Sequence, residues 1–530
     1  MYTIRTTKTG SGRTAVQVVD RAHSHTKIIK HIGTAKDAYE LHTLGKQAEA
    51  YIQEHAPQRS LLPELFAEKE TPPLAADTVI DRLSFTRTYH LFAYEFLSAF
   101  YARIGFDQLR SPLLHDFAII RVIEPASKRR SIDLLKKYFG KVYEQTAVYE
   151  FLPILKLLKA DTEQIAVSYA QAYLNFNFSL VFYDVTTLYF ETFTEDADSI
   201  DANGNSMPGL KKNGFGKERK PGQPQILIGL VVNTDGFPIH VEMFSGKTFE
   251  GHTILPVIKK LKQQYQIETL TIVADAAMLS LDNIQEIADA GLHYIVGARL
   301  GNIPVSLLKA IAEGLQKTEG SYYSDKTDRG LLICTYSEKR AAKDRSDRKK
   351  QLAKAQYQIE HPEQTKRRLR FVVEETKTTF KLNEDLLKQD TLREGIKGYY
   401  TNLTLGDTIT AADIVARYTD LWHVEQSFRI AKSDLQARPI FHRKKDAIAT
   451  HILIVFVSLC LVKAIELETQ RSMATIKDML WEIEDIAFTD TQTNKPYVKR
   501  MTTTGNPMAA LLKKIQQENV DKKEKKGNSY

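Results

Sequence analysis

An aspartate inside a strongly apolar β run is the feature that most limits how this chain can fold. The run Ser179–Phe190 (SLVFYDVTTLYF) has the β-branched and aromatic composition of a buried strand, and Asp184 lies in its middle. Aspartate is disfavoured within strands and an unpaired buried carboxylate is costly, so such a residue usually has a cation or a metal as its partner. A second acid, Asp275, ends the apolar run Leu270–Ala274, at the strand end where α/β sheets carry functional side chains.

The segments that follow Asp184 occur in the order expected for one mixed sheet covered by helices. Strand-like and helix-like runs succeed one another over residues 176–300, and turn residues separate them. We predict strands at residues 179–190, 226–232, 237–244, 270–275 and 293–299, and helices at 253–265 and 281–290. The predicted fold class is therefore α/β, a mixed five-stranded sheet with flanking helices. If the strands of Asp184 and Asp275 are neighbours, their carboxylates project together.

A basic stretch interrupts this pattern. Residues 301–394 separate the fifth strand from the strand-like Gly398–Asn402. Within them, residues 338–370 contain 12 Lys or Arg and 5 Asp or Glu, a net charge of +7, which is nearly the +8 of the whole chain. We predict a basic insertion subdomain at 301–394 within a split α/β domain at 176–300 and 395–470.

The stretch Arg417–Leu435 contains no Gly and no Pro, which predicts an unbroken helix. One apolar face, spaced by three and four residues, consists of Leu421, Val424, Phe428, Ala431 and Leu435. A second stripe with the same spacing consists of Tyr418, Trp422, Glu425, Arg429 and Lys432. An ordinary i,i+4 ion pair between Glu425 and Arg429 is enough to explain this helix by itself, so its interest depends on whether Glu425 meets the two aspartates.

Three carboxylates from two strands and a later helix suit divalent cations. Asp184, Asp275 and Glu425 offer hard oxygen ligands, which Mg²⁺ and Mn²⁺ prefer. Two such ions, about 4 Å apart, activate a nucleophile and stabilise a leaving oxygen in phosphodiester chemistry. A capped turn or a salt bridge is the ordinary explanation for any one acid alone. The competing acids, none of which ends a buried strand or lies on the second stripe, are Glu191, Glu242 and Asp413.

The remaining chain divides by composition. We predict a small β-rich module with possible DNA contacts at 1–56, a proline-containing linker at 57–79, a helical domain at 80–175, and a C-terminal helical segment with a disordered tail at 471–530. The basic turns of the helical domain suit a DNA clamp, although a plain scaffold has the same pattern.

Composition limits the class of protein. A hydrophobic content of 43% and a charged content of 26% over 530 residues are typical of soluble, multidomain proteins. The net charge of +8 favours a polyanionic partner, but mildly. Cys334 and Cys460 form no CxxC pair, so we expect no zinc site or disulfide framework and a reducing cytoplasm. The N-terminus has no apolar signal-peptide region, and the apolar run Ile452–Val462 is too short to span a bilayer, so no membrane partner is expected.

These stretches together resemble bacterial insertion-sequence transposases of the DDE class, in the group whose third acid lies in a Tyr-x2-Arg-x3-Glu-x6-Lys helix. Here that motif reads Tyr418-x2-Leu421-x3-Glu425-x6-Lys432, with Leu421 at the Arg position. Further similar stretches are Tyr183-Asp184-Val-Thr-Thr187, Gly214-Phe-Gly-Lys217 through Gln225, Phe244-Ser-Gly246, Thr253-Ile-Leu255, Ile272-Val-Ala-Asp275, Tyr294-Ile-Val296 and Leu421-Trp-His-Val-Glu425-Gln-Ser-Phe-Arg429. The resemblance covers nearly the full chain and is strongest from 179 to 460.

The resemblance implies an RNase H-like core in which Asp184, Asp275 and Glu425 hold two Mg²⁺ or Mn²⁺ ions. It also implies nicking at transposon ends and transfer of a 3′-hydroxyl into target DNA. The partners are then double-stranded DNA, as terminal inverted repeats and target, and a second copy of the chain in a synaptic homodimer, in a bacterial cytoplasm. Two alternatives stay open: an RNase H-like nuclease without strand transfer, and an inactive DNA-binding derivative.

The same resemblance assigns DNA contacts. Tyr418 and Lys432 correspond to the Tyr and Lys that contact phosphates near the active site in this family. The role of the Arg does not transfer to Leu421, and we hypothesise that Arg429 supplies the cation instead. The loop at 211–220, which includes Lys217 and Arg219, and the basic insertion are further candidates for phosphate contacts.

Overall fold

The computed structural model describes residues 2–9, 13–20, 27–35, 38–55, 81–200, 204, 206–214, 222–276, 278, 281–364, 369–376, 379–501 and 505–527. Two compact units are present, the first formed by residues 1–89 with 484–501 and the second by residues 90–483 with 502–530. The predicted linker at 57–79 lies outside the described residues.

The first unit contains two small antiparallel sheets. Strands β1 (Tyr2–Lys8), β2 (Thr14–Asp20) and β3 (Lys27–Ala35) form one sheet, and helix α1 (Ala38–His55) packs on it around Val16, Val18 and Ala48. The second sheet has the order β18 (Pro496–Met501), β17 (Glu484–Asp490), β4 (Leu83–Tyr89).

Two regions predicted to be helical therefore contain strands. β4 lies at the start of the predicted helical domain, and the β17–β18 hairpin lies in the predicted C-terminal helical segment. β4 and β17 are about 400 residues apart along the chain, so no local pattern indicates that they pair. The C-terminal helix α17 (Pro507–Gly527) also continues through residues that we predicted to be disordered.

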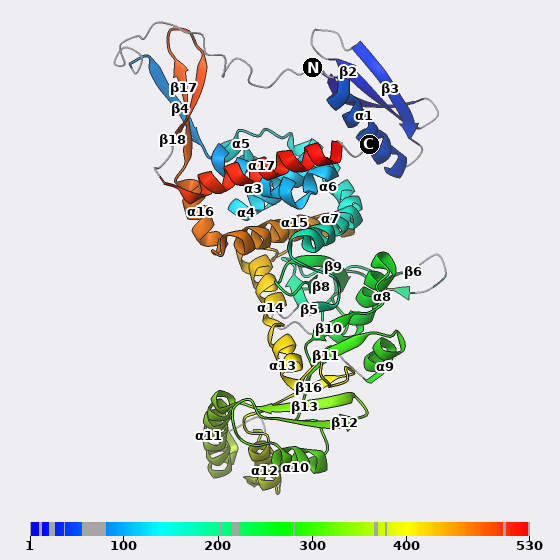
Figure 1. Cartoon of the computed structure of the whole chain (residues 1–530), viewed down its shortest axis with the longest axis vertical. Coiled ribbons are helices and arrows are strands. Elements are labelled where there is room, and N and C mark those ends of the chain that lie inside the picture. Colours follow the sequence, from blue (N-terminus) through cyan, green and yellow to red (C-terminus); the bar gives the residue numbers. More distant parts are fainter. Residues whose placement is uncertain are drawn as a thin grey trace. The chain divides into compact units, whose positions relative to one another are not determined.

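The second unit is built on an eight-stranded mixed sheet, larger than the five strands predicted (Figure 1). Its order is β12 (Tyr322–Thr327), β13 (Gly330–Tyr336), β16 (Ile396–Thr401), β11 (His293–Ala298), β10 (Thr271–Ala274), β5 (Leu180–Tyr189), β8 (Gln225–Val232) and β9 (Pro238–Ser245). All five predicted strands are present and are adjacent, from β11 to β9. The three additional strands come from the insertion and the chain just after it, so the insertion extends the sheet.

The rest of the insertion consists of helices α10 (Val305–Gly314), α11 (Glu338–Glu360) and α12 (Glu384–Leu392) with a small hairpin, β14 (Val372–Glu374) and β15 (Phe380–Leu382). Its own hydrophobic cluster, around Ala355, Phe371 and Val372, is separate from the main core. Other insertion residues, such as Ile311 of α10 and Ala341 of α11, belong to the main core, so the insertion is also packed against the sheet.

Helices cover both faces of the sheet (Figure 1). Helices α8 (Ile254–Tyr265) and α9 (Leu281–Asp289) lie on one face, and α13 (Ala411–Thr419) and α14 (Trp422–Arg429) lie on the other. A two-residue pair, β6 (Ser199–Ile200) and β7 (Ser206–Met207), lies in the loop after β5. The helical layer consists of α3 (Leu91–Ile104), α4 (Pro112–Ile123), α5 (Lys128–Phe139), α6 (Gln145–Leu155), α7 (Lys159–Tyr173), α15 (Lys445–Thr469) and α16 (Met473–Trp481).

Helix α15 is the central core helix of this layer. It is long and apolar enough to cross a membrane by length and composition, and 94% of its apolar window is buried inside the protein. It contacts α3, α4, α6 and α16 in the helical layer and β9 of the sheet (Figure 1). Burial against protein on every side explains why this helix has no polar face.

The predicted unbroken helix Arg417–Leu435 is wrong. Helix α13 ends at Thr419, α14 begins at Trp422, and a π-helical turn (Ile430–Asp434) follows. At the junction the backbone makes i→i−3 hydrogen bonds, as from Leu421 N to the Tyr418 carbonyl. α13 packs on β10 and β11, whereas α14 packs on β5 and β8. Because the sheet twists, one straight helix would not follow both pairs of strands, and the bend keeps each half in contact.

Candidate active site

Asp184, inside β5, and Asp275, directly after the end of β10, lie side by side in one row across the sheet. Strands β5 and β10 are parallel neighbours, and Phe182 pairs with Val273. Asp184 and Asp275 each lie two residues further along, so the same register places them next to each other, on strands about 4.8 Å apart. Asp184 is partly buried and Asp275 is exposed. The conditional prediction that their strands are neighbours is confirmed.

The next position in the row is a glycine that makes room for Tyr418. β10 and β11 are also parallel, with Ala274 paired to Val296, so Gly297 lies beside Asp275. A Cβ atom on Gly297 would come 2.6 Å from the Tyr418 hydroxyl, closer than real Cβ contacts allow. Tyr418 Oη donates a hydrogen bond of 3.4 Å to Asp275 Oδ1, and Ala276 N donates one of 2.7 Å to the same oxygen. The glycine thus lets the ring reach the carboxylate.

The row continues on β16 with aromatic and cationic side chains. Tyr399 pairs with Gly297, and its ring meets that of Tyr418 edge-on at 4.9 Å between centroids. Lys397 is two residues away on the same face of β16, and its Nζ lies 4.6 Å from the centre of the Tyr418 ring. Lys397 therefore lies in the same layer as the two acids, with Tyr418 between them.

Glu425, the third predicted acid, lies on α14. It is exposed, one turn beyond the junction. Burial lowers the pKa of Lys397, and the charge of Arg340 adds to this, whereas the negative charges of Asp275 and Glu425 act in the opposite direction. Burial and the charges of Asp275 and Glu425 raise the pKa of Tyr418 above its ordinary value. The charges of Asp275 and Glu425 thus contribute to the pKa of the same two side chains, after burial as the main cause.

Helix α14 is anchored so that its apolar stripe is buried, as predicted. Val424 is fully buried, and Leu421 and Phe428 are nearly so. Ser427 Oγ donates a hydrogen bond of 2.8 Å to the carbonyl of Gly236, in the turn between β8 and β9. Leu421, which we aligned with the Arg of the motif that the sequence resembles, is buried on the apolar face, where an apolar residue fits. Trp422 is 47% exposed and stacks on His423 instead of packing in the core.

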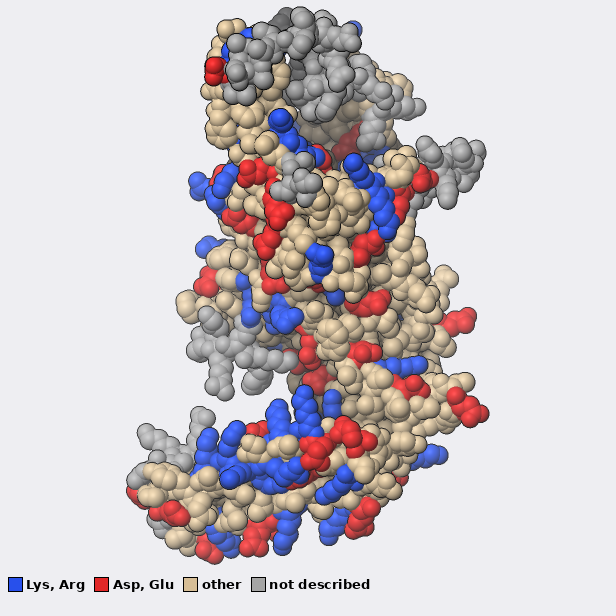
Figure 2. Space-filling model, turned by 60° about the vertical axis from the view of Figure 1, so that its left-hand side comes forward, with Lys and Arg blue, Asp and Glu red and all other residues tan. Residues whose placement is uncertain are grey.

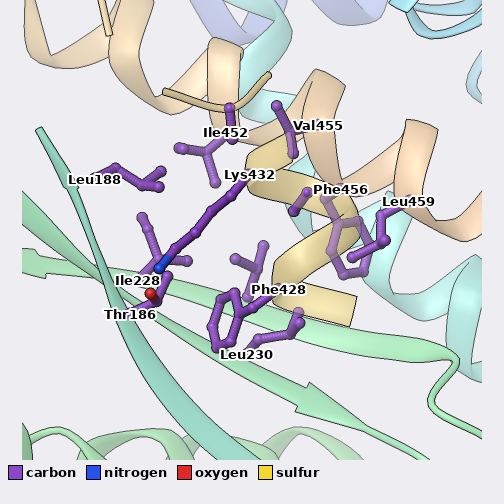
Figure 3. A pocket seen from close by; sticks show the side chains of 13 residues that line it. Thr186, Leu188, Ile228, Leu230, Phe428, Lys432, Ile452, Val455, Phe456 and Leu459 are labelled. Atoms are coloured by element: carbon purple, nitrogen blue, oxygen red, sulfur yellow. The ribbon is translucent and has the colours of Figure 1, made fainter. Parts of the chain in front are cut away.

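Lys432 lies against an internal cavity of about 30 Å³ between the sheet and helices α14 and α15 (Figure 3). Its ammonium group points along the cavity to the hydroxyl of Thr186, among apolar side chains such as Ile228 and Leu188. Thr186 is two residues from Asp184 on β5, so both face α14. In this conformation the lysine reaches the strand of the first acid from inside the protein.

Of the other three predicted DNA contacts, the structure describes Arg429. Arg429 is exposed, and no ion pair joins it to Glu425, although the structure describes both residues. The simplest interpretation of the helix, an i,i+4 ion pair, therefore does not apply. Lys217 and Arg219 lie outside the described residues.

The donor chemistry of the acid site, by which we mean Asp184, Asp275 and Glu425, fits divalent cations that prefer oxygen ligands. All three are carboxylates, and neither Cys nor His is needed to complete the set. Within the described part of the chain, no three His, Cys, Asp or Glu side chains are close enough together to hold one ion. The sheet register places Asp184 beside Asp275, and Glu425 comes from a separate helix.

Two of the three competing acids have structural partners. Asp413 forms a capping box with Thr410 at the start of α13, with Thr410 N donating to Asp413 Oδ2 at 2.8 Å. Glu242 forms an ion pair of 2.6 Å with Lys260 and lies 3.5 Å from His240. A cap and a salt bridge account for these two acids, as the sequence argument expected.

Sequence reasoning missed Gly297, Tyr399 and Lys397. The sequence contains one indication of this group, the strand-like pattern of Gly398–Asn402. That pattern does not show which strand it pairs with. Pairing of β16 with β11 brings these residues beside Asp275.

Comparison with known proteins identifies the family. The sequence profile described as "Transposase DDE domain" matches residues 181–461, more than half of the 530 residues, and the chain belongs to this family. All three residues of the acid site lie within the match. A search of the curated proteins found no match.

Two solved structures are similar in part. A piggyBac transposase synaptic complex with hairpin DNA, determined by cryo-EM, has a TM-score of 0.33 and 10% identity, covering 74% of this chain and 70% of that chain. A Mos1 transposase paired-end complex with the left transposon end has a TM-score of 0.15 and 13% identity, covering 47% of this chain and 66% of that chain.

Proposed function

We propose that this protein is a bacterial insertion-sequence transposase that cleaves DNA at transposon ends and transfers the strand into target DNA, with Asp184, Asp275 and Glu425 as its catalytic residues. The observation that carries the proposal is the register of β5 and β10, which aligns two strand-borne aspartates within a transposase DDE domain. The charge of Glu425 acts on the same Lys397 and Tyr418 as that of Asp275. We propose an RNase H-like core on the same grounds.

In this proposal the three carboxylates hold two Mg²⁺ or Mn²⁺ ions. Bound there, the ions would supply activation of the attacking oxygen and stabilisation of the leaving oxygen of a phosphodiester. The chain's own part is positional. Tyr418 orients the Asp275 carboxylate through its hydroxyl, and the closely packed sheet row keeps Asp184 beside it.

DNA is the proposed partner, as terminal inverted repeats and target, with a homodimer that brings two ends together in a bacterial cytoplasm. Contacts to phosphates are proposed for Tyr418, Lys432, Arg429, Lys217 and Arg219. Arg429 is exposed on the stripe of Glu425, which supports its role in place of Leu421. Lys432 reaches a phosphate only after its ammonium leaves the cavity beside Thr186.

A single assay tests the proposal. The protein is incubated with Mg²⁺, a labelled copy of the inverted repeat that flanks the gene, and a target plasmid. Joined products that disappear in Asp184→Ala support the transposase. Cuts without joined products contradict strand transfer and indicate a nuclease. Binding without cutting, unchanged by Asp184→Ala, contradicts catalysis and indicates a DNA-binding protein.

A further inference from the structure

A cationic cavity adjoins the acid site on the side of the insertion. It has a volume of about 410 Å³ and is bounded by the end of β11, helix α11, the end of α12 and the start of β16. Its cationic lining consists of Arg299, Arg340, Arg348, Arg370, Arg393 and Lys397, against the three acids Asp344, Asp347 and Asp390. The lining therefore has an excess of three positive charges.

The six cations fall into two groups. Arg348, Arg370 and Arg393 all form ion pairs with Asp390, which is 15% exposed, so this group is held in place by a shared carboxylate. Arg348 also pairs with Glu394. These arginines form one wall of the cavity, and the carboxylates of Asp390 and Glu394 neutralise most of their positive charge.

The second group has fewer ion pairs. Arg299 and Lys397 have no ion pair within 4 Å among the described residues, and Arg340 has only its helix neighbour Asp344, at 3.8 Å. The three come from separate elements, the loop after β11, helix α11 and strand β16. Arg299 and Arg340 are exposed and Lys397 is partly buried, so an anion from solvent can reach all three side chains. Because they line one hollow whose lining has an excess of positive charge, they favour an anion there.

Lys397 connects this cavity to the acid site. It lines the cavity with Arg340, and its Nζ also covers the ring of Tyr418, whose hydroxyl donates to Asp275. A second hollow, of about 490 Å³, has both Lys397 and Arg340 in its lining as well. Lys and Arg side chains gather over the insertion where it borders a hollow of the surface (Figure 2). An anion held by this pair would lie next to the carboxylates.

We propose that Arg299, Arg340 and Lys397 form a phosphate-binding subsite that holds the backbone of a DNA strand beside the bond at the acid site. The inference rests on the proposed function, because it takes DNA as the ligand. It assigns the insertion a specific role: α11 supplies one wall of the active site through Arg340. Guanidinium and ammonium groups suit phosphate oxygens by charge and by hydrogen bonding.

The test is DNA binding by the full chain as a function of salt, with a fluorescein-labelled duplex in EDTA so that no cutting occurs. Each lost phosphate contact lowers the slope of log affinity against log salt by about 0.9. We expect Arg340→Gln and Lys397→Met each to lower the slope by about that amount and to weaken binding roughly tenfold at moderate salt.

Lys349→Gln is the matched control. Lys349 is exposed on the same helix, nine residues after Arg340, and thus about two and a half turns away on the opposite side. It removes the same charge without touching the cavity, and we expect binding close to that of the unmodified chain. Thermal unfolding of each variant shows that the fold is retained.

Equal effects of Arg340→Gln and Lys349→Gln would overturn the subsite, because they would mean that only the overall charge matters. Unchanged slopes in both cavity variants would overturn it as well. The assay needs no catalysis, so it stays decisive if the protein does not cut DNA. In that case the proposed function fails by itself, and Asp275→Ala provides the corresponding arm, with binding retained and cutting lost.

Discussion

Two charged clusters lie on opposite faces of the same sheet. The charges of one are buried and paired with each other, whereas the acids of the other are exposed. On the α7 face, Glu163 and His240 are buried, with 3.1 Å between Oε1 and Nδ1, and Lys159 pairs with the same carboxylate at 2.8 Å. On the α14 face, Asp275 and Glu425 are exposed, and their charges contribute to the pKa of Lys397 and of Tyr418. The alternation of side chains along β9 separates the faces, since His240 faces α7 and Val241 lines the cavity under α14.

The comparison separates charges that are paired within the fold from charges that are available to a ligand, within one domain. In the Glu163 cluster, which consists of Lys159, Glu163, His240, Glu242 and Lys260, every acid has a cation, so the cluster stabilises the fold and leaves nothing for a ligand. The acid site concentrates negative charge near solvent instead, and the cavity beside it concentrates positive charge. The following changes test that distinction.

The largest expected effect is on catalysis. Asp275→Ala or Glu425→Ala is expected to lower DNA cleavage in Mg²⁺ by roughly a thousandfold or more, because a lost metal ligand removes several kcal/mol of transition-state stabilisation. The unfolding midpoint should change little, since both side chains are exposed. Asp420→Asn, an exposed acid at the junction of α13 and α14, is the control and should cleave normally. Cleavage retained in Glu425→Ala would remove that residue from the acid site.

A change in the Glu163 cluster should instead lower the stability of the fold. Glu163→Gln leaves His240 and Lys159 without their buried partner, and we expect the free energy of unfolding to fall by about 3 kcal/mol or more. Urea unfolding measures the loss. Glu286→Gln breaks the exposed pair with Lys259 and should change stability by less than about 1 kcal/mol. A similar result for both variants would mean that burial does not distinguish the clusters.

Gly297→Ala tests the packing that connects the sheet row to Tyr418. The added Cβ meets the tyrosine hydroxyl at 2.6 Å, so the ring must move, at a cost of about 1–3 kcal/mol in the free energy of unfolding. Tyr418→Phe removes the hydroxyl, and the double variant should regain part of the lost stability. If the double variant is no more stable than Gly297→Ala, the contact does not explain the glycine.

The smallest effect concerns pH. Although burial opposes ionisation, His240 and Lys159 hold the pKa of Glu163 below its ordinary value. The unfolded chain binds this proton more tightly, so the stabilisation is complete above about pH 4.3 and is lost as pH falls through the lower pKa of the folded state. Unfolding free energy measured between pH 6 and pH 3 should fall less steeply in Glu163→Gln. Parallel curves would contradict the assignment.

Much of the domain was predictable because its signals are local. The β run around Asp184, the acid that ends the strand at Asp275 and the buried stripe of α14 each depend on residue spacing over a few positions. All five predicted strands are present, and Val424 and Phe428 are buried as expected. Period-two and period-3.6 patterns follow from backbone geometry, so they can be recognised without a partner.

Non-local pairing was not predictable in the same way. β4 pairs with β17, which is distant in the sequence, and β12 and β13 of the insertion join the main sheet. The segment Arg417–Leu435 bends although it contains no Gly or Pro. In each case the competing force is contact with a distant strand, which overrides local propensity. The same applies to Lys397, which carries no motif.

The sequence by itself indicated the transposase DDE family, which the family match shows, and it singled out Asp184, Asp275 and Glu425 as candidate catalytic acids. An aspartate within or directly after an apolar β run is informative because burying an unpaired carboxylate is costly. Only the tertiary structure decided what surrounds them. The register of β10 against β11, and of β11 against β16, places Gly297 under Tyr418 and Lys397 beside Arg340. Strand register depends on cross-strand packing over the whole sheet, so a one-residue shift that leaves every local pattern intact would separate these residues.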